Sequence, residues 1–220
     1  MSFYSETEIN AGMSAKTGRL ITKALPKDSN RVFSIETEPA IEPVTVIELK
    51  TFARIDYSDE DSLLEGFITA VRMAAEEYTG RSFIERTIVM LMDWWPGTVV
   101  ELPRPPLISI TKVATLDEDD TETEYASTNY YVVTAAVLGK LVLKQSVQEP
   151  TNTDRDYSGF LIRYKAGYGD EASDVPGPIK EGIKTWASIA QATRVIDPKN
   201  PPPEACTFLD LYRTAEVMIR

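Results

Sequence analysis

Apolar side chains recur at helical spacing between residues 59 and 79. Intervals of three and four residues place such side chains on one face of a helix. Ser58 to Asp61 supplies capping groups and puts negative charge in the first turn, which the helix dipole favours. Gly80 stands where a left-handed residue ends many helices. The expected buried face consists of Leu64, Phe67, Ile68, Val71, Ala75 and Tyr78.

Two further helices are predicted on either side of this one in the sequence, over 45–54 and 178–195. Thr45 and Glu48 have the spacing of a capping box, in which each side chain bonds the other residue's backbone N–H. Residues 178–195 follow two prolines and carry an apolar stripe at helical spacing. That stripe consists of Ile179, Ile183, Trp186, Ala187 and Ala190.

Residues 82–166 have a different pattern, with short β-type runs separated by prolines, glycines and polar turns. Phe160 to Lys165 alternates with a period of two. The expected strands are 88–92, 99–102, 108–116, 130–134, 141–143 and 160–165. The fold class is therefore α+β, a helical core over 44–198 with an inserted small antiparallel β module.

Both ends of the chain are predicted to lie outside this domain. Residues 1–43 lack a sustained period and form an extended arm, whose aromatic residues Phe3, Tyr4 and Phe33 are candidates for contact with a partner. Residues 199–220 contain a proline spacer and an amphipathic helix over 204–219. Its apolar face must either pack back on the domain or dock on another chain. The candidate interface residues are Phe208, Leu211, Tyr212, Met218 and Ile219.

Composition excludes several classes of function. The 220 residues carry a net charge of −11, which repels phosphate backbones and argues against sequence-specific nucleic-acid binding. The chain has no histidine and a single cysteine, so histidine-based catalysis, histidine metal sites and an intrachain disulfide are excluded. No signal-peptide pattern and no apolar run of about 20 residues is present. We expect a soluble protein made in the cytoplasm that needs no cofactor and no metal.

Two motifs have a simpler and a functional interpretation. Asp117, Glu118, Asp119 and Asp120 could bind calcium, but the glycine and glutamate of an EF-hand loop are missing, so a solvated hairpin loop is favoured. The functional version of this loop is an acidic surface that faces a DNA channel or a tail partner. Gly167 to Ala172 resembles a dinucleotide fingerprint, yet no helix follows at once, so a glycine turn is favoured.

Several segments in a fixed order resemble one family. The order is the capped helix from Thr45, a long helix that ends Glu77-Tyr78-Thr79-Gly80-Arg81, the segment Glu101 to Ser109, and Arg163 to Gly169 followed by a proline-led helix. This order is similar to that of the head–tail connector, or head-completion adaptor, proteins of tailed phages and related gene transfer particles. The resemblance covers residues 44–190.

The resemblance implies a structural virion protein at the head–tail interface and no catalysis. It implies a homo-oligomeric ring, expected to be dodecameric, beneath the portal protein, with stopper or tail proteins on the other side and DNA in the channel. It also implies that the C-terminal segment grips the portal. The host cytoplasm is then where the chain is made, and no membrane is involved.

Three other functions remain as alternatives. A stopper or tail terminator would also form a ring, although such proteins consist mostly of β-strands. An enzyme with a carboxylate site would have to work without histidine. A carbohydrate-binding β module could stack sugars on Trp94 and Trp95, which requires both rings to be exposed.

Overall fold

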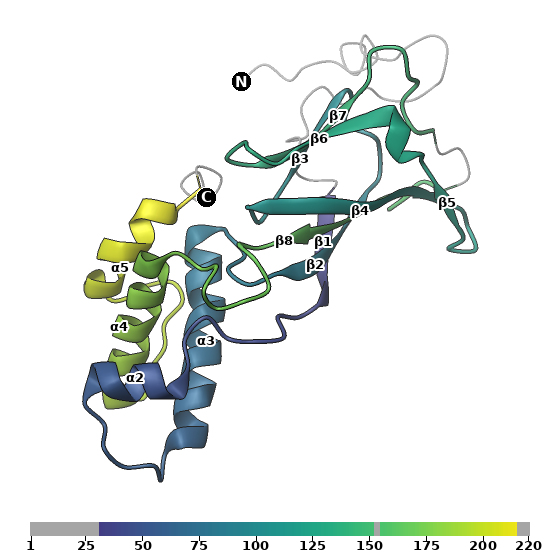
Figure 1. The fold of residues 1–220 in the computed structure, drawn as a ribbon. Helices are drawn as coiled ribbons and strands as arrows, with labels where there is room; N and C mark the ends of the chain where they lie inside the picture. Colours follow the sequence, from purple (N-terminus) through teal and green to yellow (C-terminus); the bar gives the residue numbers. More distant parts are fainter. Residues whose placement is uncertain (1–30, 152–154, 215–220) are drawn as a thin grey trace, which may run out of the picture.

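A computed structural model describes residues 31–151 and 155–214. Four α-helices pack together at one end of the molecule, and two antiparallel sheets form the other end (Figure 1). The helical end and the sheet end each have a hydrophobic core of their own. The predicted α+β class is confirmed.

Helix α2, Val46–Ala53, begins with the predicted capping box. The Glu48 amide donates to Thr45 Oγ1 at 3.2 Å, and the Thr45 amide donates to Glu48 Oε2 at 2.8 Å. Lys180 Nζ, which comes from another helix, lies 3.1 Å from Glu48 Oε1. Partial burial alone would raise the pKa of Glu48, but these hydrogen bonds and the lysine charge hold that pKa below its ordinary value.

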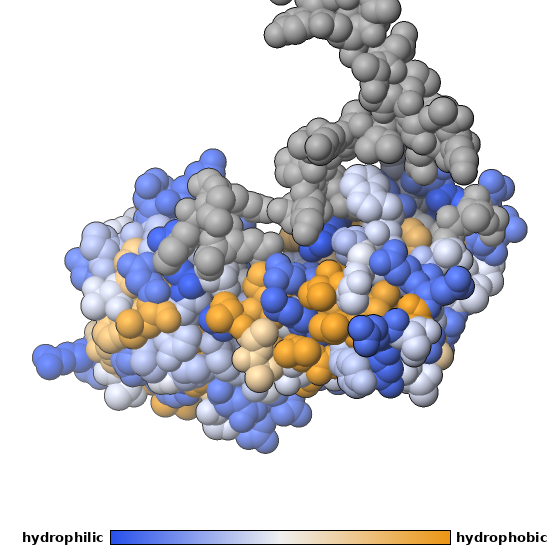
Figure 2. All heavy atoms as spheres, turned by 90° about the horizontal axis from the view of Figure 1, so that it is seen from above, coloured by the Kyte–Doolittle hydropathy of each residue, from blue (hydrophilic) through white to orange (hydrophobic). Residues whose placement is uncertain are grey.

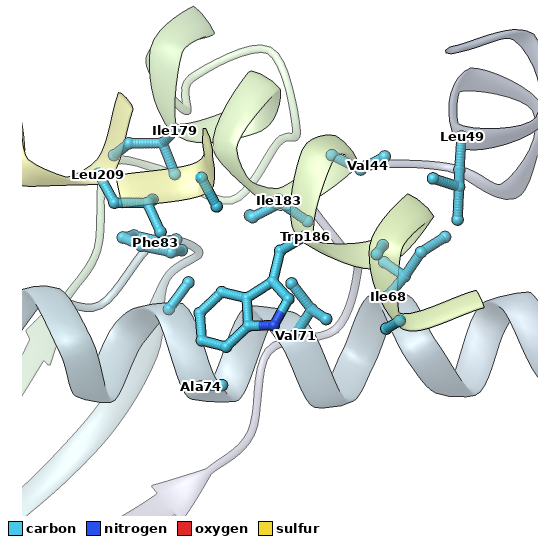
Figure 3. Packing of buried hydrophobic residues seen from close by; sticks show 14 of the residues in the cluster. Val44, Leu49, Ile68, Val71, Ala74, Phe83, Ile179, Ile183, Trp186 and Leu209 are labelled. Atoms are coloured by element: carbon cyan, nitrogen blue, oxygen red, sulfur yellow. The ribbon is translucent and has the colours of Figure 1, made fainter. Parts of the chain in front are cut away.

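Helices α3, Asp61–Thr79, and α4, Gly177–Thr193, form the helical core with α2. Trp186 of α4 is 1% exposed and its ring lies against α3, close to Val71 and Ala74 (Figure 3). Gly80 ends α3 in the left-handed conformation, with φ 70°, as predicted. The start of α3 differs from the prediction, because no side chain caps it. Glu60 precedes the helix and instead binds Arg194 Nη2 at 2.6 Å.

The sheet end consists of two antiparallel sheets. The larger has the order β1-β2-β8-β4-β5, with β1 Arg31–Thr37, β2 Arg86–Met92, β8 Phe160–Ala166, β4 Leu107–Leu116 and β5 Glu122–Glu124. The smaller has the order β3-β7-β6, with β3 Val99–Leu102, β7 Gly139–Leu143 and β6 Tyr130–Val133. Every second residue of β2 is buried, and Ile88, Met90 and Met92 share a core with residues of the smaller sheet such as Leu141. The two sheets therefore pack face to face.

Residues 1–30 of the predicted extended arm lie outside the described residues, and the next part of that arm is a strand. Residues 31–37, which the sequence placed in that arm, pair with β2 and form an edge strand of the larger sheet. Val32, Phe33 and Ile35 are all more than 40% exposed, so no buried apolar face marks this segment in the sequence. Backbone pairing with β2 holds it, and such pairing leaves no hydrophobic period.

A buried ion network joins the helical end to the sheet end. Glu76 of α3 is 2% exposed, and its carboxylate accepts from Arg86 Nη2 of β2 at 2.5 and 2.6 Å. The same carboxylate accepts from Arg72 Nη1 at 2.9 Å and from the Phe83 amide at 2.8 Å. Arg72 Nε donates in turn to Glu42 at 2.8 Å. Two arginines and two glutamates thus balance one another, with Arg72, Arg86 and Glu76 buried and Glu42 partly exposed.

The neighbouring carboxylates keep Arg72 charged despite its burial. Burial alone would lower the pKa of Arg72, but the carboxylates of Glu76 and Glu42 raise that pKa above its ordinary value. Arg104, from the loop after β3, donates to the Glu76 carbonyl at 3.1 Å and pairs with Glu77 at the surface. The end of α3 is therefore fixed to two separate segments of the sheet end.

We predict that Glu76→Gln lowers the free energy of unfolding by about 3 kcal/mol or more, because a neutral amide leaves two buried arginines without their shared carboxylate. The matched control is Glu77→Gln, one residue along the same helix, whose side chain is 56% exposed. That variant should lose less than about 1 kcal/mol. Urea unfolding of both variants measures the difference, and equal losses would contradict the role of Glu76.

Candidate functional site

The C-terminal segment packs back on the helical core. Helix α5, Pro203–Leu209, is followed by the 3-10 turn η3, Asp210–Tyr212. Ala205 and Leu209 are fully buried, and Leu209 lies over Gly182 of α4. The predicted continuous helix over 204–219 is wrong, because the chain leaves the α-helix at Leu209 and Arg213 is extended, with φ −62° and ψ 133°.

Polar contacts fix η3 to the end of α3. The Tyr78 hydroxyl donates to Asp210 Oδ1 at 2.5 Å, and burial together with this bond raises the pKa of Tyr78. Arg81 Nε donates to the Tyr212 carbonyl at 2.6 Å. The Thr214 amide donates to the Thr79 carbonyl at 2.9 Å. The segment up to residue 214 is thus part of the domain.

The structure separates the predicted C-terminal interface residues. Leu211 is 72% exposed and points away from the core that Leu209 enters. Phe208 and Tyr212 are half-buried against this chain's own helices, and Tyr212 packs edge-on against Tyr168. Met218 and Ile219 lie outside the described residues. Leu211 is therefore the described member of this set that is most available to a partner.

The candidate arm contacts also fall in different places. Phe33 lies on β1 and is 43% exposed. Phe3 and Tyr4 lie outside the described residues.

The acidic loop forms the turn between β4 and β5, as the hairpin interpretation predicts. Asp117 Oδ1 accepts from the Asp119 amide at 3.0 Å and from the Thr121 amide at 2.8 Å. Asp120 takes the left-handed conformation, with φ 61°, and pairs with Arg155. The turn is therefore held by its own hydrogen bonds.

The carboxylates of this hairpin differ in their surroundings. A hydrogen bond from Lys112, with help from the Arg163 charge, holds the pKa of Glu122 below its ordinary value. Glu118 and Asp119 are exposed at the tip, and the structure records no ion pair for either within the described ranges. The tip thus presents two uncompensated negative charges.

Two surface features were not predicted. The first is an apolar area on the smaller sheet, seen from above in Figure 2, where hydrophobic side chains gather over its strands. Its exposed members are Val99, Tyr131, Val132, Val133 and Val137. The continuous apolar run from Tyr130 to Val133 was a signal for it, because an alternating strand with one buried face would not carry such a run.

The second is a pocket between β1, β2 and the loop after β3, which we call the arginine pocket. Its volume is about 220 Å³. It is lined by Phe33, Ser34, Ile35, Ser82, Arg86, Ile88 and Arg104. These residues come from four separate segments, so their spacing in the sequence does not predict a pocket.

The other motifs have structural roles. Gly167 adopts φ 139° in the turn after β8, where a Cβ would lie 2.6 Å from the backbone of Ile84. Trp95 is 8% exposed and packs against Phe160 and Tyr125, whereas Trp94 is 45% exposed. The two rings are not both exposed, which removes the basis for the carbohydrate-binding alternative.

Two other kinds of site are absent from the described ranges 31–151 and 155–214. No group of three or more cysteine, aspartate or glutamate side chains there could hold a metal ion. No helix in this part of the chain is long and apolar enough to cross a membrane.

Comparison with protein families places this architecture. Residues 43–136, from the start of the helical core to just beyond β6, match the model of the phage gp6-like head-tail connector protein family. This match covers less than half of the 220 residues, and it supports the resemblance that the order of segments in the sequence suggested. No curated protein matches the chain.

Solved structures share the fold of this chain. A chain in the neck of an empty GTA particle, computed with C6 symmetry, superposes with a TM-score of 0.72 at 19% identity, covering 84% of this chain and 96% of that chain. A chain in the virion of a native gene transfer agent gives 0.71 at 19% identity, with the same coverage. A chain in the neck of a native GTA particle, computed with C12 symmetry, gives 0.66 at 19% identity, covering 83% and 96%.

We predict opposite effects of two glycine-to-alanine changes in the helices. Gly66 is exposed on α3, where an added Cβ meets nothing within 4 Å, so Gly66→Ala should raise the free energy of unfolding by up to about 1 kcal/mol. At Gly182 a Cβ would lie 2.9 Å from Leu209, and overpacking typically costs about 1–3 kcal/mol, so Gly182→Ala should be destabilising. Thermal unfolding measures both, and equal stabilisation would show that α5 does not rest on α4.

Proposed function

We propose that this protein is a head–tail connector, a ring subunit beneath the portal of the virion, which it joins to the stopper or tail proteins while DNA passes through the channel. The observation that carries the proposal is the family match over residues 43–136, which lies on the helices and sheets described above. The role is structural, and its mechanism is assembly of preformed surfaces with no catalytic step.

A ring of twelve subunits is the arrangement that the comparisons favour. The similar chains come from neck structures computed with C6 and C12 symmetry. A closed ring requires each subunit to present two different complementary surfaces, one to each neighbour. The net charge of −11 suits a ring that encloses DNA, because a surface of the same sign as the phosphates binds them weakly.

In this proposal, the C-terminal segment binds the portal. Leu211 is 72% exposed on a turn that Tyr78, Arg81 and Thr79 hold in place. An apolar side chain on a preformed turn loses little conformational freedom on docking, so more of its burial contributes to affinity. The six residues after Thr214 add Met218 and Ile219.

We predict that Leu211→Ser weakens binding to the portal by about tenfold, because burying a leucine contributes roughly 1.5–3 kcal/mol. Stability of the free chain should not change, since this side chain is largely in solvent already. The matched control is Val195→Ser, whose side chain is 62% exposed after the end of α4. Pull-down with the purified portal of the same particle and thermal unfolding measure the two effects.

Electron microscopy tests the proposed function directly. The full chain and a chain cut after Thr214 are each mixed with the portal. A ring on the portal with the full chain, and a weaker or absent ring with the cut chain, is the expected result. The cut keeps Ala205 and Leu209, which a cut at Pro203 would remove from the core. If the protein does not bind the portal but binds the ends of tail tubes, it is instead a terminator or stopper.

A further inference from the structure

The arginine pocket contains two buried hydrogen-bond donors without acceptors. Ser82 is 0% exposed and its Oγ has no partner among the described residues. Arg86 is 6% exposed; its Nη2 binds Glu76, but its Nε likewise has no acceptor in the described ranges. Buried donors nearly always find a partner, because leaving one unpaired costs about 1–3 kcal/mol. The pocket therefore offers hydrogen-bond donors to an acceptor that the described residues do not supply.

The donors favour a carboxylate. Arg86 and Arg104 both line the pocket, and guanidinium N–H groups make their strongest hydrogen bonds to carboxylate oxygens. Phe33, Ile35 and Ile88 form an apolar wall, which limits competition from water. A volume of about 220 Å³ is several times the roughly 30 Å³ share of one water, so an aspartate or glutamate side chain fits.

The acidic loop lies at the opposite corner of the same sheet. The strand order puts β1, beside the pocket, and β5, beside the loop, at the two edges, about 19 Å apart for four spacings of ~4.8 Å. The loop follows β4 at the end where Thr115 pairs with Phe160, and Phe160 pairs with Met92, the residue of β2 farthest from Arg86. One subunit therefore cannot bring its own loop to its own pocket.

We propose that, in the ring, the β4–β5 loop of one subunit places the Glu118 or Asp119 carboxylate in the arginine pocket of the next copy. This inference rests on the proposed ring assembly. It uses two different surfaces at opposite edges of one subunit, which is the requirement for a closed heterologous ring. The loop is held by Asp117 before contact, so docking orders little additional chain.

Cross-linking tests the contact itself. In a Cys206→Ser background, Ile35→Cys on the pocket rim and Asp119→Cys on the loop are combined in the full chain. Portal-bound rings are then treated with a short bismaleimide. The expected result is a ladder of covalent multimers, and neither single-cysteine variant should form one. Rings without a ladder would overturn the contact alone, whereas the absence of rings would overturn the proposed function and the contact with it.

A pair of substitutions tests the chemistry. Ser82→Ala and the double variant Glu118→Gln/Asp119→Asn should each raise the concentration needed for half-assembly on the portal by about tenfold, the effect of losing a charge-assisted hydrogen bond. Ser82→Ala should leave the melting temperature of the free chain unchanged or higher, because the hydroxyl has no partner among the described residues.

The matched control changes the same net charge elsewhere. Glu65→Gln/Glu204→Gln removes two exposed carboxylates from α3 and α5. Equal weakening by this control would reduce the effect to net charge and overturn the proposal. If Ser82→Ala lowers the melting temperature but the variant assembles normally, water occupies the pocket and the proposal is overturned. If sulfate binding requires Ser82 while the loop variants assemble normally, the pocket binds a free anion, and the proposal is likewise overturned.

Discussion

The Glu76 carboxylate is the group on which the arrangement of this protein depends. It lies at the C-terminal end of α3 and binds Arg72 on its own helix, Arg86 on β2 and the Phe83 amide between them. A buried ion network is sensitive to geometry, because each charge is costly unless its partner is in place. The helical and sheet ends, which have separate cores, therefore meet in one orientation.

That fixed orientation matters for a ring subunit. The C-terminal turn with Leu211 is held on α3 by Tyr78 and Arg81, and the arginine pocket contains Arg86, which Glu76 also binds. The proposed portal contact and the proposed neighbour contact are thus attached to the same helix end. A subunit in which these two surfaces moved independently would close a ring less reproducibly.

The two edges of the larger sheet have different properties, which a heterologous contact requires. The β1 edge has exposed Val32, Phe33 and Ile35 and the pocket beside it, whereas the β5 edge carries an acidic turn. Docking an acidic turn beside an exposed edge strand also discourages uncontrolled strand pairing there. The chain therefore has a physical reason to keep negative charge at one corner and arginines at the other.

The sequence by itself determined the elements whose signal is local. The capping box at Thr45, the apolar face of α3, its end at Gly80 and the alternating strands around Phe160 each follow from neighbouring residues, and the order of these segments was sufficient to suggest the family. Only the tertiary structure decided where β1 pairs, since an exposed edge strand has no hydrophobic period.

The tertiary structure also decided the path of the C-terminal segment and the position of the arginine pocket. Leu209 turns inward over Gly182, a contact between residues far apart in the sequence that shortens the helix the periodicity predicted. The pocket brings together Ser82, Arg86 and Arg104 with β1, and its unpaired donors are defined only once every other partner is in place. Local patterns determine helices and strands, whereas the whole fold determines whether each buried polar group has a hydrogen-bond partner.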